Sequence, residues 1–165
     1  MRLFLLDFGA WLFFHLTISL GLIKLPDRFF SIDHELNQLF KERGFEDKGK
    51  FWKEKLSVHK WKDKLPDGAS LFNAGYKKKE LTSSHISTIE TFIKETKRAE
   101  LTHWLLIVPA PLFFLWNPVW AGWLMIFYAL LVNVPFIIIQ RYNRIRLDRI
   151  KKEKNEKNER MTDNK

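Results

Sequence analysis

The chain has 165 residues, enough for one soluble domain, but its mean hydropathy of -0.23 averages apolar ends with a highly charged middle. It contains no cysteine, which excludes disulfides, thiol catalysis and cysteine-based metal sites. The net charge of +9 suits nucleic acid or anionic lipid. No RNA-binding motif accompanies that charge, so we predict a membrane lipid partner and no nucleic acid.

Residues 1–25 are predicted to be an N-terminal transmembrane anchor. The run LFLLDFGAWLFFHLTISLGLIKL, residues 3–25, exceeds the roughly 20 residues that a helix needs to span a bilayer. A cleaved signal peptide is the alternative interpretation. Arg2 is the single charge before the apolar run, and Asp7 breaks that run early. A signal peptide typically has a more strongly positive start and an uninterrupted apolar run, so we favour a retained anchor.

Residues 26–100 are predicted to form a basic amphipathic segment at a membrane interface. Apolar residues recur at helical spacing from Ser31, a candidate N-cap, to Phe40. The next stretch, FEDKGKFWKEKLSVHKWKDKLPDG at residues 45–68, combines many lysines with two tryptophans. Such a stretch lies in the plane of the lipid headgroups, or it packs as an ordinary exposed helix on a neighbour, and the sequence leaves both open.

The same segment is predicted to end in a further helix. Pro66-Asp67-Gly68 is a turn signal. Residues 81–100 then form a helical run, with Ser83 or Ser84 as a candidate cap.

Residues 101–140 are predicted to be a transmembrane helical hairpin. Residues 101–116 are apolar but short, and Pro109 and Pro111 bend them. A turn follows at Asn117-Pro118, and residues 119–139 are long enough for a full span.

The last 25 residues, 141–165, are predicted to be a basic tail that is disordered after Ile150. Arginines and lysines begin directly after the last span, which places the C-terminus in the cytoplasm by the positive-inside rule. The fold class expected is therefore an all-α integral membrane protein. It has about three apolar helices, the anchor and the hairpin, with a cytoplasmic amphipathic segment between them.

Polar residues on the two arms of the hairpin are expected to meet. His103 lies 14 residues before Asn117 and Asn133 lies 16 after it, so they stand about 21 and 24 Å from the turn at 1.5 Å per residue. Glu100 and Arg141 lie farther from the turn on the same two arms, toward the cytoplasmic side. We therefore predict that these four side chains converge near the cytoplasmic interface, where polar residues commonly mark function.

Glu100 and His103 are three residues apart and share a helix face. A carboxylate beside an imidazole fixes the tautomer of the ring, which suits a general base, although a pair that only caps or packs has the same spacing. A di-iron site would need a second Glu-x-x-His motif, which the sequence lacks, so we predict no metal. No cofactor motif is present either.

Three blocks of the sequence resemble a known family. They are residues 45–68, ETKRAELTHW at residues 95–104 and NVPFIIIQRYNRIR at residues 133–146, and PDRFF at residues 26–30 is similar as well. Together they resemble the glycosyl-4,4'-diaponeurosporenoate acyltransferase family. The resemblance spans about residues 26–147.

The resemblance implies an integral enzyme of the bacterial cell membrane that attaches a fatty acyl chain to the glucose of a glycosylated carotenoid, in the synthesis of a staphyloxanthin-type pigment. The acyl donor would be an acyl-CoA, an acyl carrier protein or a lipid, and other enzymes of the carotenoid pathway are candidate partners. The expected catalytic residues are His103 as the base and Glu100 as the group that orients it. The alternative is a non-catalytic membrane scaffold or a lipid-binding protein of such a pathway. The residues expected to bind substrate are Arg98, Trp104, Asn133, Arg141 and Tyr142.

Overall fold

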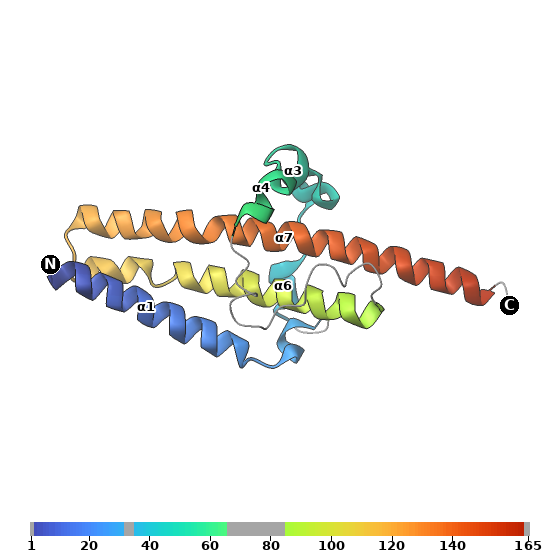
Figure 1. Ribbon diagram of the computed structural model, residues 1–165, viewed down its shortest axis with the longest axis horizontal. Helices are drawn as coiled ribbons and strands as arrows, with labels where there is room; N and C mark the ends of the chain where they lie inside the picture. Colours follow the sequence, from blue (N-terminus) through green and yellow to red (C-terminus); the bar gives the residue numbers. More distant parts are fainter. Residues whose placement is uncertain (1, 32–34, 66–84, 164–165) are drawn as a thin grey trace.

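The computed structural model describes residues 2–31, 35–65 and 85–163, and every regular element in these ranges is a helix. Three long elements run side by side (Figure 1): α1 Arg2–Ile23, α6 Ile86–Ile107 and α7 Val119–Asp163. A 3-10 helix, η5 Ala110–Leu115, connects α6 to α7. The all-helical class expected from the sequence is therefore confirmed.

Short helices connect α1 to α6. They lie on both sides of the pair formed by α6 and α7. The helices α3 and α4 pack against the middle of α7, and η1 contacts α6 (Figure 1). In chain order they are η1 Asp27–Phe30, α2 Asn37–Phe40, η2 Gly44–Gly49, α3 Lys50–Glu54, α4 Val58–Trp61 and η3 Lys62–Lys64.

The start of α1 lies beside the turn between η5 and α7. One carboxylate oxygen of Asp7 accepts hydrogen bonds from the indole of Trp116, at 2.8 Å, and from the amide of Asn117, at 2.7 Å. Aromatic contacts hold the same end together, since the rings of Trp11 and Phe113 stack at 4.8 Å. The N-terminus and the hairpin turn therefore share one end of the molecule, and α1 runs antiparallel to α6 (Figure 1).

Two helices of the described residues, 2–23 and 119–162, are long and apolar enough to cross a membrane, judged by length and composition. The third apolar stretch, residues 101–116, forms no continuous helix. Its helix ends at Ile107, because Pro109 and Pro111 lack the N–H groups that an α-helix would need there. The bend lies where the sequence placed it, and the described residues contain two candidate spans where the sequence predicted about three apolar helices.

Large apolar side chains remain exposed over α1 and the first half of α7, a surface that we call the apolar band. A soluble protein of this size rarely leaves so many large side chains in contact with water. The band consists of Leu3, Phe4, Leu5, Leu6, Phe8, Leu12, Phe13, Leu16, Leu20 and Ile23 on α1 and Val119, Trp120, Trp123, Leu124, Phe127, Leu130 and Leu131 on α7.

The close approach of η5 to α7 depends on Gly122. A Cβ atom at this position would lie 2.4 Å from two ring carbons of Phe114, which itself packs edge-on against Trp123. We expect Gly122→Ala to cost about 1–3 kcal/mol of stability through overpacking. Melting temperatures in detergent would measure this. Gly9→Ala is the matched control, because a Cβ there meets nothing within 4 Å, and equal melting temperatures for both variants would contradict the prediction.

The structure differs from the predicted disorder of the tail, because α7 continues as one helix to Asp163. The tail is rich in lysine, glutamate and arginine, which favour helix, and oppositely charged residues four apart support it. Arg149 lies 3.7 Å from Glu153, and Lys152 lies 4.0 Å from Glu156. A hydropathy pattern cannot distinguish such an exposed helix from a disordered charged tail.

The predicted helix from Ser31 to Phe40 is found only in part among the residues that the structure describes. Ser31 caps the C-terminal end of the 3-10 helix η1, with its hydroxyl donating to the carbonyl of Arg28 at 2.7 Å, and the four-residue α2 covers Asn37–Phe40. Residues 45–65 form several short helices. Asp47 and Lys48 have positive φ at a kink within η2, and Ser57 has positive φ directly before α4. The predicted turn at 66–68 and the caps at Ser83 and Ser84 lie outside the described residues.

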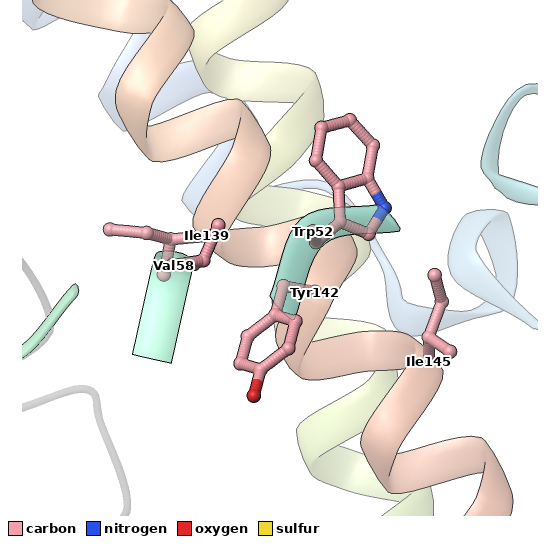
Figure 2. Packing of buried hydrophobic residues seen from close by; sticks show 5 residues of the cluster. All are labelled: Trp52, Val58, Ile139, Tyr142 and Ile145. Atoms are coloured by element: carbon pink, nitrogen blue, oxygen red, sulfur yellow. The ribbon is translucent and has the colours of Figure 1, made fainter. Parts of the chain in front are cut away.

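The segment of α3 and α4 packs on α7 through a small apolar core. Trp52 and Val58 lie against Ile139, Tyr142 and Ile145 of α7 (Figure 2). Gly49 makes the approach close, because its φ of +86° is a left-handed conformation and a Cβ would touch Ile145 at 3.4 Å. The structure shows packing of this segment on a neighbouring helix, and its position in the plane of the lipid headgroups stays a prediction.

Candidate functional site

His103 and Asn133 face each other across α6 and α7. The imidazole Nδ1 lies 2.9 Å from the amide oxygen Oδ1 of Asn133. The amide nitrogen of Asn133 donates to the carbonyl of Ala129 at 2.8 Å, and Asn133 is 2% exposed. Since that nitrogen is already a donor to its own helix, Oδ1 must accept the proton carried by Nδ1. The pair therefore leaves the other ring nitrogen, Nε2, with its lone pair available.

The imidazole of His103 is also held by stacking. Its ring lies parallel to the ring of Phe136, with centroids 4.7 Å apart and planes 9° from parallel. The histidine is partly exposed. A ring fixed in orientation and tautomer, with an unprotonated nitrogen, is the arrangement that a general base needs.

One helical turn away lies a buried group of four charges, which we call the arginine–carboxylate network: Glu46, Glu100, Arg141 and Arg144. Arg141 donates to Glu100 at 2.9 Å and to both carboxylate oxygens of Glu46, at 3.0 and 2.8 Å. Arg144 donates to the second oxygen of Glu100. The two positive and two negative charges balance, so the buried group is neutral as a whole.

The expected hydrogen bond from the His103 imidazole to the Glu100 carboxylate is replaced by this network. Glu100 is 1% exposed, and its oxygens accept from Arg141, Arg144 and the indole of Trp104, the last at 3.4 Å. Guanidinium groups compete better than a neutral imidazole for a buried carboxylate, because they neutralise its charge. The orienting group of His103 is therefore Asn133, which was expected to bind substrate.

The other sequence-predicted site residues are placed as follows. Arg98 donates to the carbonyls of Leu22 and Leu25 at 2.6 and 2.7 Å, and pairs with Asp27 at 2.6 Å. It thus completes the C-terminal end of α1, where carbonyls have no helical partner. Tyr142 is buried in the apolar core under α3 and α4, whereas Trp104 is half exposed beside Glu100.

The four side chains that were predicted to converge therefore form two separate pairs, about one turn apart along α6. His103 meets Asn133, and Glu100 meets Arg141. Sequence reasoning missed Glu46 and Arg144. Arg144 could have been found, because it lies three residues after Arg141 and so shares its helix face. Glu46 gives no such signal, because it lies in an irregular segment without periodicity.

The pKa of Glu46 is lowered. Burial, the largest influence, raises it, but the bonds from Arg141, the backbone of Arg43 and Trp52, with the charge of Arg141, outweigh burial. Because the folded pKa lies below the ordinary value of 4.5, the stability that Glu46 contributes is complete above that value and is lost as pH falls through the folded pKa. We expect the melting temperature in detergent to fall as the pH drops below about 4.5. Glu46→Gln should show a weaker acid dependence, and an equal dependence would assign the effect to other carboxylates.

Fold and site together define a class of protein. It is a helical bundle that carries an oriented, partly exposed histidine next to an exposed apolar surface. Such a protein is equipped for proton transfer on a molecule that is itself largely apolar.

Comparison with known proteins supplies the family. The family model described as glycosyl-4,4'-diaponeurosporenoate acyltransferase matches residues 36–153. A relative of that name from Staphylococcus aureus strain MRSA252 is 42% identical over 140 residues, which cover 85% of this chain and 82% of the relative. Another, from strain Newman, is 41% identical over 152 residues and 90% of each chain. No solved structure matches.

The chain belongs to the glycosyl-4,4'-diaponeurosporenoate acyltransferase family, and it is an enzyme that transfers acyl groups. The family resemblance predicted from the three sequence blocks is thereby confirmed, and all three blocks lie within the matched residues.

Proposed function

We propose that the protein is an integral membrane enzyme that esterifies a fatty acyl chain onto the glucose of a glycosylated carotenoid, in staphyloxanthin-type pigment synthesis. The observation that carries this proposal is the His103–Asn133 pair, at the border between the apolar band and the charged half of the molecule. A glycosylated carotenoid has the same division, because its polyene belongs in hydrocarbon and its sugar in the headgroup zone. A base at that border would meet the sugar.

In the proposed reaction, Nε2 of His103 takes the proton from a glucose hydroxyl. The hydroxyl oxygen attacks the carbonyl carbon of the acyl donor, the new ester bond forms, and the bond to the leaving group breaks. The imidazolium then returns its proton to the leaving group, so the base is regenerated. Asn133 is the positioning residue, because it holds Nδ1 as the protonated nitrogen throughout.

The arginine–carboxylate network has a supporting role in this proposal. Arg141 donates four hydrogen bonds, two to Glu46, one to Glu100 and one to the carbonyl of Lys41, so little of its donor capacity remains for a substrate. We therefore assign Glu100 and Arg141 to holding α6, α7 and the short-helix segment in register. Trp104, half exposed one residue after His103, is the better candidate for contact with the sugar.

The membrane orientation is part of the proposal. With the C-terminus in the cytoplasm, the turn after η5 and the start of α1 lie outside, and the short helices lie inside. The chain has no cysteine, so single cysteines can be labelled without background. We expect Leu115→Cys, 78% exposed near the turn, to react with an impermeant thiol reagent in intact cells. Lys157→Cys should react only after permeabilisation, and the reverse pattern would overturn the orientation.

The function is tested by mass spectrometry of lipids from cells of the source organism with and without the gene. The proposal predicts that an acylated glycosyl-carotenoid disappears on deletion and that its unacylated precursor accumulates. An acylated product that persists would refute the proposal. Full restoration of that product by the His103→Ala protein would favour a non-catalytic scaffold instead.

A further inference from the structure

A groove with a volume of about 590 Å³ lies between the short helices and the second half of α7. It is separate from the His103–Asn133 pair and is mostly basic. Its lining residues are Lys48, Gly49, Lys50, Lys53, Glu54, His59, Lys62, Asp63, Tyr142, Arg146 and Arg149. Six of these are lysine or arginine and only two are acidic.

Two cations of this groove form only weak pairs with acids. Lys50 lies 3.9 Å from Asp47, and Arg149 lies 3.7 Å from Glu153. All four side chains are more than half exposed, and such pairs are weak and screened by salt. A ligand with several phosphate groups could therefore replace the acids, because phosphate oxygens accept charge-assisted hydrogen bonds from lysine and arginine.

The position of the groove limits the kind of ligand. Along α7, Tyr142 and Arg149 lie 9 and 16 residues after Asn133, which is about 14 and 24 Å of axial rise, and they lie on the opposite face of the helix, the face that carries α3 and α4. In a phospholipid, the ester carbonyl is only a few bonds from the phosphate, so it cannot reach His103 while its phosphate is in the groove. A thioester on a long pantetheine arm carries its reactive carbonyl much farther from its phosphates, so only such a donor could pass round α7 from the end of the groove near Tyr142.

We infer that the groove binds the nucleotide of an acyl-coenzyme A donor, a 3'-phosphorylated adenosine diphosphate. This inference rests on the proposed function and names its donor. The volume of the groove is in the range of sites for small molecules, and several phosphates on one nucleotide match its concentration of positive charge. An acyl carrier protein would bring a single phosphate on its arm and would need a broad protein interface.

With this donor, the reaction is balanced by groups already assigned. The glucose oxygen forms an ester bond to the acyl carbon, and the bond from that carbon to the coenzyme A sulfur breaks. The hydroxyl proton passes through Nε2 of His103 to the departing thiolate, and coenzyme A leaves as its thiol. The groove takes no part in these bond changes, since it only holds the nucleotide while the arm crosses to His103.

The test measures binding of coenzyme A, the probe, to the full-length protein in nanodiscs of uncharged phosphatidylcholine, by titration calorimetry. The groove variant is Lys53→Glu with Arg146→Glu. Its matched control is Lys60→Glu with Lys157→Glu, which makes the same change of charge on the same two parts of the fold but outside the groove. We expect the groove variant to bind about tenfold to a hundredfold more weakly than the wild type. The control should bind as the wild type does.

Absence of binding by the wild type, or an equal loss in both double variants, would overturn the inference. So would complete displacement of coenzyme A by phosphatidylglycerol added to the nanodiscs, since the groove would then be a headgroup site. Because binding needs no turnover, this test is independent of the proposed function. If the cells make the acylated glycolipid but the protein does not bind coenzyme A, the groove assignment fails and the proposed function stands.

Discussion

Replacing His103 by alanine is expected to reduce acyl transfer by about 10²- to 10⁴-fold, the usual contribution of a general base. The reason is that the buried amide of Asn133 sets the tautomer of the His103 ring. No other histidine in the part of the chain that the structure describes has such a partner. The measurement is the rate of acylated glycolipid formation by purified protein in nanodiscs. The variant should still insert and melt as a folded protein, because the ring is only partly buried.

His85→Ala is the matched control, since His85 is an exposed histidine just before α6. It should keep full activity. If His103→Ala also keeps full activity, His103 is not the base.

The dependence of His103 on Asn133 gives a second measurement on the same pair. Asn133→Leu removes the acceptor for Nδ1 and so frees the tautomer and the angle of the ring. We expect a clear loss of activity in the wild-type background and no further loss in His103→Ala, because residues that act as a unit are not additive. Independent losses that simply multiply would show that Asn133 acts on something other than His103.

Breaking the arginine–carboxylate network is expected to have the largest effect on stability. Arg141→Met would leave Glu46 and Glu100, which are 0% and 1% exposed, without the guanidinium that joins them. Loss of one partner from a buried ion pair costs about 3–5 kcal/mol, because the remaining charge is uncompensated. Thermal unfolding in detergent should show a large drop in melting temperature. Activity should fall with it, since the network holds α6 and α7 together one turn from His103.

Arg149→Met is the control for this change. Arg149 is another arginine of α7, but its partner Glu153 lies at 3.7 Å and both side chains are more than half exposed. Exposed pairs contribute about 0–1 kcal/mol, so this variant should melt close to the wild type. A double variant, Arg141→Met with Glu46→Gln, should recover part of the loss because one unpaired charge is removed. Equal melting temperatures for Arg141→Met and Arg149→Met would contradict a structural role for the network.

The sequence by itself determined the register of the hairpin and the family. Two proline residues and Asn117-Pro118 mark the bend, and a helix rises by a constant amount per residue, so counting from the turn places His103 opposite Asn133. Local chemistry of this kind does not depend on distant parts of the chain. The sequence could not determine the number of apolar helices, because backbone hydrogen bonding after Ile107 depends on how the prolines are accommodated.

Only the tertiary structure decided which partner each charged residue takes. Glu100 was expected beside His103, yet it binds Arg141 and Arg144, because two guanidinium groups from α7 and a carboxylate from η2 meet at its buried position. Glu46 lies in a segment without helical period, so nothing local predicts where it lies. The role of Arg98 at the end of α1 could not be predicted either, because its partners are carbonyls more than 70 residues away in the chain. Periodicity determines which face of a helix a residue occupies, whereas the choice of partner depends on the competition among all groups that packing brings together.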